Sequence, residues 1–359
     1  MIKVLVVDDS ALMRKLLGKV FSDEGDFETA FARDGREALE ILDAVQPDVV
    51  TLDIHMPHLD GLATLDRIML ERPCPVVMVS SLTAEGAETT LEALRLGAVD
   101  FVAKPGGAVS LKLDQFAPDM VAKVRAAAGA KLRTTRRLQE RVRHRIAGKP
   151  LAVRARGRAE IETALAPAVG QGLVLVGTST GGPPALEALL TPLPADFPWP
   201  ILVAQHMPAS FTGPLAQRLN GLCALTVVEV VEPTVLAPGR VYIGRGEGDI
   251  VVARRGAGLV ARPAAALSDY LWHPSTDRLV RSAMECLAAT QLVGVLMTGM
   301  GDDGAAAMAA LHAQGGRTIA ESEETAVVWG MPGELVKAGG ADFVVPVQKI
   351  ADRLQKLTP

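Results

Sequence analysis

The sequence predicts an α/β protein built from two mostly parallel sheets. First, short continuous runs of apolar residues alternate with stretches whose apolar residues recur at helical spacing. Second, the runs are continuous rather than alternating apolar and polar, as in parallel strands that helices cover on both faces. Third, the alternation of apolar strands and amphipathic helices stops after residue 125 and resumes at Gly172. We therefore divide the 359-residue chain into two domains.

In the N-terminal domain the strands are short and rich in β-branched residues. The stretch 11–21 has the apolar spacing of an amphipathic helix, and further helical segments separate the later strands. The expected strands are 3–9, 27–32, 48–54, 75–81 and 100–105.

The C-terminal domain contains strands of the buried type at 173–177, 200–206 and 291–299. Between the second and the third lie 239–244, 249–254 and 258–262, which Gly-rich turns separate. This spacing indicates hairpins. We therefore expect a doubly wound, mostly parallel sheet with an antiparallel hairpin edge.

A basic stretch joins the two domains. Residues 123–158 carry 13 Lys and Arg against one acidic residue, Glu140, although the net charge of the chain is -4. We interpret 126–168 as a solvated linker between a domain at 1–125 and a domain at 169–359; contact with an acidic surface is the alternative. Aromatic residues form only 4% of the chain, and the linker has none to stack on bases, so we expect no nucleic acid partner.

The cysteines and the N-terminus indicate the compartment. Cys74, Cys223 and Cys286 are scattered and odd in number, which argues against a disulfide framework and for a reducing environment. The N-terminus reads as a strand rather than a leader, and no apolar run approaches the ~20 residues that span a bilayer. We expect a cytoplasmic protein without membrane insertion.

Polar side chains fall at the ends of the N-terminal strands: Asp8, Asp9, Asp53, Ser80 and Lys104. In an open α/β sheet these ends meet at one edge, where ligands bind. Clustered carboxylates suit a hard cation such as Mg²⁺. With Lys104 neutralising a phosphoryl group and Ser80 donating to it, Asp53 can attack and form an acyl phosphate. Carboxylates that only cap helices are the alternative.

The motifs VVDDS, LDIHMPHLDG, MVSS and AKP make residues 1–125 similar to a two-component receiver domain. The resemblance implies a flavodoxin-like fold and phosphorylation of Asp53 by a histidine kinase. It also implies Mg²⁺ held by Asp8, Asp9 and Asp53, with the backbone carbonyl of His55 completing the shell. We interpret His55 and His58 as incidental loop histidines rather than a transition-metal site.

Residues 175–190 run from a strand through a turn of small residues into a helix, with Ser179 between glycines. The turn can hold a phosphate, or Ser179 can be a nucleophile. No Lys-Ser/Thr follows as in a Walker A loop. Pro183 and Pro184 remove two N–H donors from the first helical turn, which weakens an anion site.

A nucleophilic serine needs a base and a group that orients the base. His206 follows the strand 200–205, and Asp303 follows the strand 291–299, so both reach the same edge as Ser179. Asp302 competes with Asp303 for the third role. The backbone N–H of Met300, in the Gly-rich turn, is the candidate oxyanion hole.

Four long motifs, GTSTGGPPALEALL, AQHMPASFTGPLAQRL, MTGMGDDGAAAM and ETAVVWGMPGEL, resemble the chemotaxis protein-glutamate methylesterases. With the receiver domain, the resemblance extends over nearly the whole chain, although the arginine-rich linker is unusually long. It implies Ser179 as nucleophile, His206 as base and Asp303, rather than Asp302, as the orienting acid. The implied substrates are glutamate methyl esters on the cytoplasmic helices of chemoreceptors, with methanol leaving, and specific receptor glutamines.

The two domains suggest a switch in which the unphosphorylated receiver covers the catalytic edge and phosphorylation of Asp53 loosens this contact. Two other functions stay open at this point. The C-terminal domain can be a non-catalytic module that binds a partner, or it can bind a nucleotide through the glycine turn.

Overall fold

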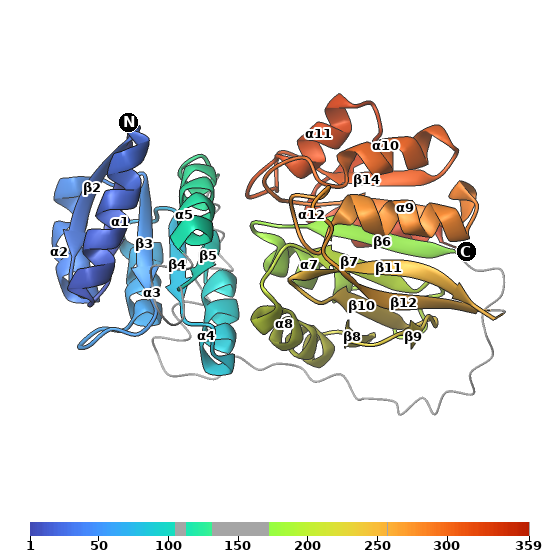
Figure 1. Ribbon diagram of the computed structural model, residues 1–359, viewed down its shortest axis with the longest axis horizontal. Helices are drawn as coiled ribbons and strands as arrows, with labels where there is room; N and C mark the ends of the chain where they lie inside the picture. Colours follow the sequence, from blue (N-terminus) through green and yellow to red (C-terminus); the bar gives the residue numbers. More distant parts are fainter. Residues whose placement is uncertain (105–112, 131–171, 257, 359) are drawn as a thin grey trace. The chain divides into compact units, whose positions relative to one another are not determined.

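In the computed structural model the chain divides into two compact units, Met1–Ala152 and Val153–Pro359 (Figure 1). The structure describes residues 1–104, 113–130, 172–256 and 258–358. Nearly all of the expected linker, 126–168, lies outside these residues, and the expected domain boundaries stay predictions. The three cysteines are free.

The first unit is a five-stranded, fully parallel sheet in the order β2-β1-β3-β4-β5. This order is that of the flavodoxin-like fold, which the resemblance to receiver domains implied. Each expected strand is present, within two residues at either end. The strands are β1 (Ile2–Val7), β2 (Phe27–Ala32), β3 (Val49–Asp53), β4 (Val76–Ser80) and β5 (Asp100–Ala103). The helices are α1 (Ala11–Glu24), α2 (Gly35–Val45), α3 (Gly61–Glu71), α4 (Ala84–Arg95) and α5 (Leu113–Ala128).

Side chains at the strand–helix turns define where these helices begin. The N-cap residues Ser10, Asp34, Asp60 and Thr83 each accept a hydrogen bond from a backbone N–H in the first turn. The middle strands β3 and β4 are buried along their whole length, as expected where helices cover both faces.

The second unit contains a seven-stranded parallel sheet in the order β15-β14-β13-β6-β7-β10-β8. The strands that follow β6 in the chain, beginning with β7, lie on one side of β6 in the sheet, and those from β13 onward lie on the other side. The strand order therefore reverses between β6 and β13. Ligands of open α/β sheets bind beyond the strand ends at such a reversal. The strands are β6 (Leu173–Thr178), β7 (Ile201–Gln205), β8 (Thr226–Val230), β10 (Arg240–Gly244), β13 (Leu292–Leu296), β14 (Arg317–Glu321) and β15 (Phe343–Val345).

Helices and a short 3₁₀ turn connect these strands. They are α7 (Gly182–Leu190), α8 (Ala209–Leu222), α9 (Thr276–Cys286), η2 (Ala289–Gln291), α10 (Ala305–Ala313), α11 (Met331–Lys337) and α12 (Val347–Leu357).

The antiparallel hairpin is present, but its place differs from the expected one. Strands β11 (Gly248–Arg255) and β12 (Gly258–Ala265) pair with β9 (Thr234–Val235) in a separate three-stranded sheet, not with the edge of the parallel sheet. The stretch 239–244, expected in a hairpin, is the inner parallel strand β10. Val241, Tyr242 and Ile243 are fully buried there, so both faces of this strand need cover. Helix α9 packs against both β11 and β6; Figure 1 shows it beside these two strands.

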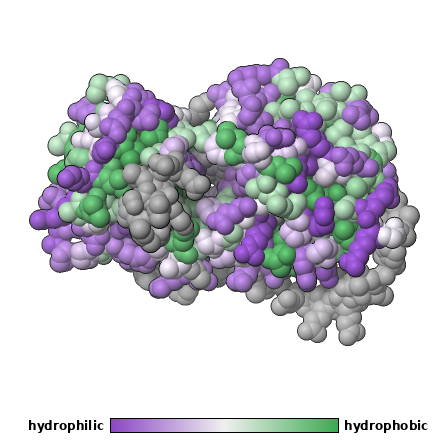
Figure 2. All heavy atoms as spheres, viewed as in Figure 1, coloured by the Kyte–Doolittle hydropathy of each residue, from purple (hydrophilic) through white to green (hydrophobic). Residues whose placement is uncertain are grey.

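The surface of each unit mixes apolar and polar side chains, as Figure 2 shows for one face. Such a mixture is ordinary for globular domains. Across the part of the chain that the structure describes, every helix is too short or too polar to cross a bilayer.

Candidate active site and phosphorylation site

Strand register brings Ser179 and His206 side by side. In the parallel pair β6–β7, Thr178 is paired with Gln205, so Ser179 and His206 are the next residues of the two chains. The backbone N–H of His206 donates to the carbonyl of Thr178 at 3.1 Å, which extends the pairing past the strand ends. A hydroxyl and an imidazole therefore leave the sheet at neighbouring positions.

The side chain of Gln205 connects the turn that follows β6 to the turn that follows β7. Its buried side-chain amide donates to the carbonyls of Ser179 and His206, at 3.0 Å each. Gly182 leaves room for this side chain, because a Cβ at position 182 would lie 2.0 Å from Gln205 Oε1. The two backbone turns are thus tied to one side chain.

Asp303 completes the group from the loop after β13. Its Oδ2 lies 2.8 Å from Nε2 of His206, and the carboxylate is buried. It also accepts hydrogen bonds from the start of α9: the Ser275 hydroxyl and the backbone N–H groups of Thr276 and Asp277, at 3.0, 2.6 and 3.0 Å. The positive end of the helix dipole thus faces the carboxylate.

These contacts keep Asp303 ionised. Burial alone raises its pKa, but the hydrogen bond and charge of His206, together with the N–H groups of Asp277 and Thr276, outweigh burial and lower it. The neighbouring Asp302 is exposed, and within the described part of the chain its backbone carbonyl alone is engaged, by Ala305 N–H. Of the two adjacent aspartates, the geometry favours Asp303 as the partner of His206.

The carboxylate occupies Nε2, so Nδ1 is the nitrogen of His206 left to accept a proton. Nδ1 is buried and has no hydrogen-bond partner among the residues that the structure describes. One face of the ring lies against Trp272, with ring centroids 5.6 Å apart and planes 12° from parallel. In this structure no hydrogen bond joins Ser179 to His206. A loose contact is common before substrate binds, so it does not argue against the pair.

The Gly-rich turn after β13 lies directly against the serine. A Cβ at Gly299 would stand 2.8 Å from Ser179 Cβ and 2.2 Å from Met331 Sδ, so only glycine fits. The backbone N–H of Ser179 donates to Thr298 O at 2.9 Å. Met300 follows Gly299, and among the described residues its N–H has no hydrogen-bond acceptor.

In the first unit, the strand ends bring Asp8, Asp53 and Lys104 together. Lys104 Nζ lies 3.0 Å from Asp8 Oδ2 and 2.7 Å from Asp53 Oδ2. Burial raises the pKa of Asp53, only partly countered by Lys104. Burial alone would lower the pKa of Lys104, but the hydrogen bond and charge of Asp53 raise it. The pair is therefore a buried carboxylate with a firmly protonated lysine.

The donor set suits a hard cation. One carboxylate oxygen each from Asp8, Asp9 and Asp53 lies within 4.8 Å of the others, and Asp8 Oδ2 has no hydrogen bond beyond its ion pair with Lys104. All three donors are carboxylates, the ligands that Mg²⁺ prefers. His55 and His58 are exposed and take no part in this cluster.

The Ser80 hydroxyl is hydrogen-bonded to α4 in this structure. Ser80 is fully buried, its hydroxyl donates to Gly86 O at 3.2 Å, and it accepts a hydrogen bond from Thr90 at 2.8 Å. A phosphoryl group on Asp53 would gain this donor only if the hydroxyl rotated away from α4.

The comparisons with known proteins identify the family of the chain. The family described as CheB methylesterase matches residues 174–354, and the family described as response regulator receiver domain matches residues 4–113. The chain belongs to the CheB methylesterase family. Its first unit contains a response regulator receiver domain.

Named relatives share nearly the whole length of this CheB-family chain. "Protein-glutamate methylesterase/protein-glutamine glutaminase 2" of Rhodopseudomonas palustris is 59% identical over 98% of this chain and 96% of its own. The corresponding protein 3 of Rhodospirillum rubrum is 51% identical over 99% and 95%. The crystal structure of the CheB methylesterase catalytic domain of Thermotoga maritima is 36% identical, covers 53% of this chain and all of its own, and has a TM-score of 0.51.

Sequence reasoning missed part of this CheB-family site. It did not include Gln205, which contacts Ser179 and His206, Trp272, which contacts His206, or the start of α9, which contacts Asp303. A faint signal was available in the stretch 270–277, where an aromatic pair precedes Ser-Thr-Asp, a typical helix start.

Proposed function

We propose that this chain hydrolyses methyl esters of glutamate side chains on the cytoplasmic helices of methyl-accepting chemoreceptors, and deamidates specific receptor glutamines at the same site. The observation that carries the proposal is the buried Asp303–His206 pair at the reversal point of the sheet: His206 is the neighbour of Ser179 just past the β6–β7 pairing, and its Nδ1 has no hydrogen-bond partner among the described residues. The names of the full-length relatives support the substrate class.

The reaction takes two acyl-transfer steps. His206 Nδ1 accepts the hydroxyl proton as Ser179 Oγ attacks the ester carbonyl, and the imidazolium is stabilised by the Asp303 carboxylate. The proton then passes to the leaving methoxide, so methanol departs and the glutamyl group stays esterified to Ser179. Water, deprotonated by His206, attacks this ester, and glutamate leaves as the serine regains its proton. For glutamine, ammonia replaces methanol in the first step.

The backbone around the serine supports the developing oxyanion. The N–H of Met300, in the turn against Ser179, has no acceptor among the described residues and is free to donate to it. One such donor contributes about 3 kcal/mol to transition-state stabilisation.

The receiver domain supplies regulation. A histidine kinase donates the phosphoryl group to Asp53 in the cytoplasm, and phosphorylation raises methylesterase activity. Asp8, Asp9 and Asp53 would hold Mg²⁺, which neutralises charge on the transferring phosphoryl group. Lys104 neutralises a further oxygen, and Ser80 donates to it after leaving Gly86 O.

The test of the enzyme is methanol release from methylated receptor by wild type and by Ser179→Ala. We expect release to fall to background in the Ser179→Ala variant, and a serine-reactive phosphonate to label the wild type but not this variant. Ser322→Ala is the matched control, because its buried hydroxyl has no hydrogen-bond partner and lies outside the proposed machinery. Turnover retained by Ser179→Ala would refute the nucleophile. No turnover and no labelling in wild type would favour a partner-binding module instead.

A further inference from the structure

A second buried aspartate, Asp249 on β11, lies behind the proposed triad. Its carboxylate is completely buried, and three donors surround it. Nδ1 of His273 lies 2.9 Å from Oδ1, the N–H of Ser275 donates to the same oxygen at 2.7 Å, and Arg278 donates to Oδ2 at 2.6 Å. All three donors belong to the loop and first turn of α9, so this carboxylate fixes that segment to β11.

The same segment contacts two members of the triad. Ser275 donates its hydroxyl to Asp303, while its own backbone N–H donates to Asp249. The next two N–H groups along the chain also go to Asp303. Trp272, adjacent to His273, stacks on the His206 ring. A shift of residues 272–277 would therefore move both Asp303, which these residues hydrogen-bond, and the Trp272 ring that stacks on His206.

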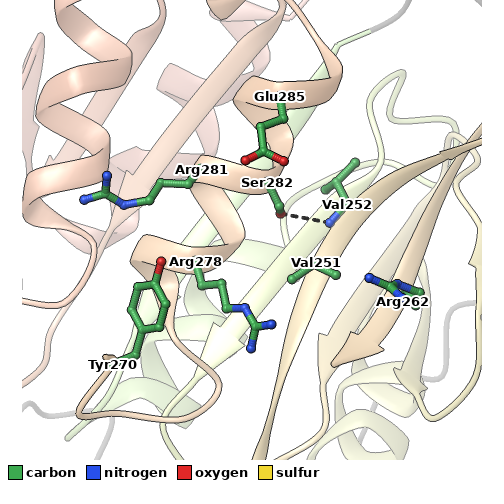
Figure 3. A pocket seen from close by; sticks show the side chains of 8 residues that line it. All are labelled: Val251, Val252, Arg262, Tyr270, Arg278, Arg281, Ser282 and Glu285. Carbon is green, nitrogen blue, oxygen red and sulfur yellow. Dashed lines mark hydrogen bonds between the residues drawn. The ribbon is translucent and has the colours of Figure 1, made fainter. Parts of the chain in front are cut away.

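Arg278 keeps the charge of Asp249 balanced at this depth. Its guanidinium forms the ion pair with Asp249 and also donates to the carbonyl of Ala265 on β12. The side chain lines a cleft of about 290 Å³ between α9 and the hairpin, together with Tyr270 and Arg281 (Figure 3). An ionised carboxylate buried without such a partner would be costly, so the pair is expected to persist in the folded protein.

From this arrangement we infer that Asp249 is a positioning residue for the esterase reaction: it acts through the loop at 272–277 to hold Asp303 and His206 in line with Ser179. It touches no reacting atom. If Asp249 no longer held this loop, kcat would fall. Losing a hydrogen-bonded partner behind a site displaces the reacting groups slightly, and such displacements lower the reaction rate far more than they weaken ground-state binding of the substrate.

The chain contains a matched control for this role. Asp342, just before β15, accepts from the same kinds of donor: His312 Nδ1 at 3.1 Å, Arg317 at 3.0 Å and the N–H of Thr318 at 2.8 Å. It lies at the amino ends of β14 and β15, the edge opposite the catalytic one. Asp249→Asn and Asp342→Asn thus disrupt similar sets of hydrogen bonds. Only the set around Asp249 includes residues that contact the triad.

The inference rests on the proposed function, and two readouts separate their failures. The first is kcat and KM for ester hydrolysis on methylated receptor; the second is the rate constant for labelling of Ser179 by a phosphonate, which needs no receptor. For Asp249→Asn we expect kcat and the labelling rate to fall roughly 10- to 100-fold, with KM within about twofold of wild type. Asp342→Asn should lower Tm without changing either rate constant.

Two results would overturn the inference: Asp249→Asn with a wild-type labelling rate, or Asp342→Asn slowed as much as Asp249→Asn. Wild type that is labelled but releases no methanol would overturn the substrate assignment alone. If Asp249→Asn does not fold, His273→Gln removes one of the three ties at a partly exposed residue. This substitution should still slow the labelling of Ser179 by roughly threefold or more. An unchanged labelling rate would refute the inference.

Discussion

Replacing Asp303 by Asn keeps the shape of the side chain but removes its charge and one acceptor atom. The carboxylate accepts from four donors: Ser275 Oγ and Asp277 N on Oδ1, and His206 Nε2 and Thr276 N on Oδ2. An amide offers one acceptor oxygen and two N–H donors. In either orientation of the amide, one buried N–H at the start of α9 loses its acceptor, at a cost of about 1–3 kcal/mol to stability.

The catalytic loss is large in both orientations. If the amide nitrogen faces His206, it donates to Nε2, and the ring proton moves to Nδ1, the nitrogen needed to accept from Ser179. A wrong tautomer of this kind costs about 10⁴-fold in kcat in serine proteases. If the oxygen faces His206, the tautomer is kept but the charge is lost. At an effective dielectric constant near 20 that charge is worth about 4 kcal/mol, or roughly 10³-fold.

We therefore expect Asp303→Asn to lower kcat for methyl ester hydrolysis by at least about 10³-fold. Asp302→Asn is the matched control, because the side chain of this exposed neighbour forms no hydrogen bond within the described ranges. Steady-state methanol release measures both variants. A variant at position 303 that retains a tenth of wild-type kcat, or equal losses at both positions, would refute the assignment of the acid.

Three further predictions follow from named contacts. Asp53→Asn should leave basal methanol release within about twofold of wild type but abolish its stimulation by a small phosphodonor; a variant that is still stimulated would contradict Asp53 as the acceptor. Gly299→Ala places a methyl group 2.8 Å from Ser179 Cβ and should lower kcat roughly 10- to 100-fold, whereas Gly221→Ala, with nothing within 4 Å, should leave kcat unchanged; equal kcat values would show that the turn does not press on the serine. The pKa of Asp303 is lowered in the folded state, so its stabilising effect is present above the unfolded value near 3.9 and lost as pH falls through the folded value. The stability gap between wild type and Asp303→Asn in urea titrations should therefore narrow toward acid pH, and a constant gap would contradict the lowered pKa.

Sequence alone could predict which residues reach the edge of each sheet, because this depends on local pattern. Apolar runs identify parallel strands, and the residue that ends such a strand lies at the carboxyl edge wherever the strand sits in the sheet. Ser179, His206 and the pair Asp302 and Asp303 were located in this way, although β6 and β13 are about 120 residues apart. The family resemblance then selected Asp303 of the two aspartates. The argument needs only the end of each strand, not its neighbours.

Neighbour relations were harder to predict. The stretch 239–244 was expected in a hairpin because Gly-rich turns flank it, but it is a parallel strand between β7 and β8. Turn composition reports where a strand ends and does not report which strand it pairs with. Burial of Tyr242 on an inner strand is decided by the helices and sheets that cover it, and these contacts are not encoded locally.

The contacts behind the triad illustrate why its supporting residues stay hidden in a sequence. Asp303 receives three of its four hydrogen bonds from residues 275–277, some 27 positions earlier in the chain. These donors are mostly backbone N–H groups at a helix start, which any sequence can supply, so no residue type marks them. What selects this helix start is that β11 holds it in place through Asp249. The residue types of such a site can therefore be predicted from sequence. The exact positions of their side chains depend on long-range contacts that only the folded chain contains.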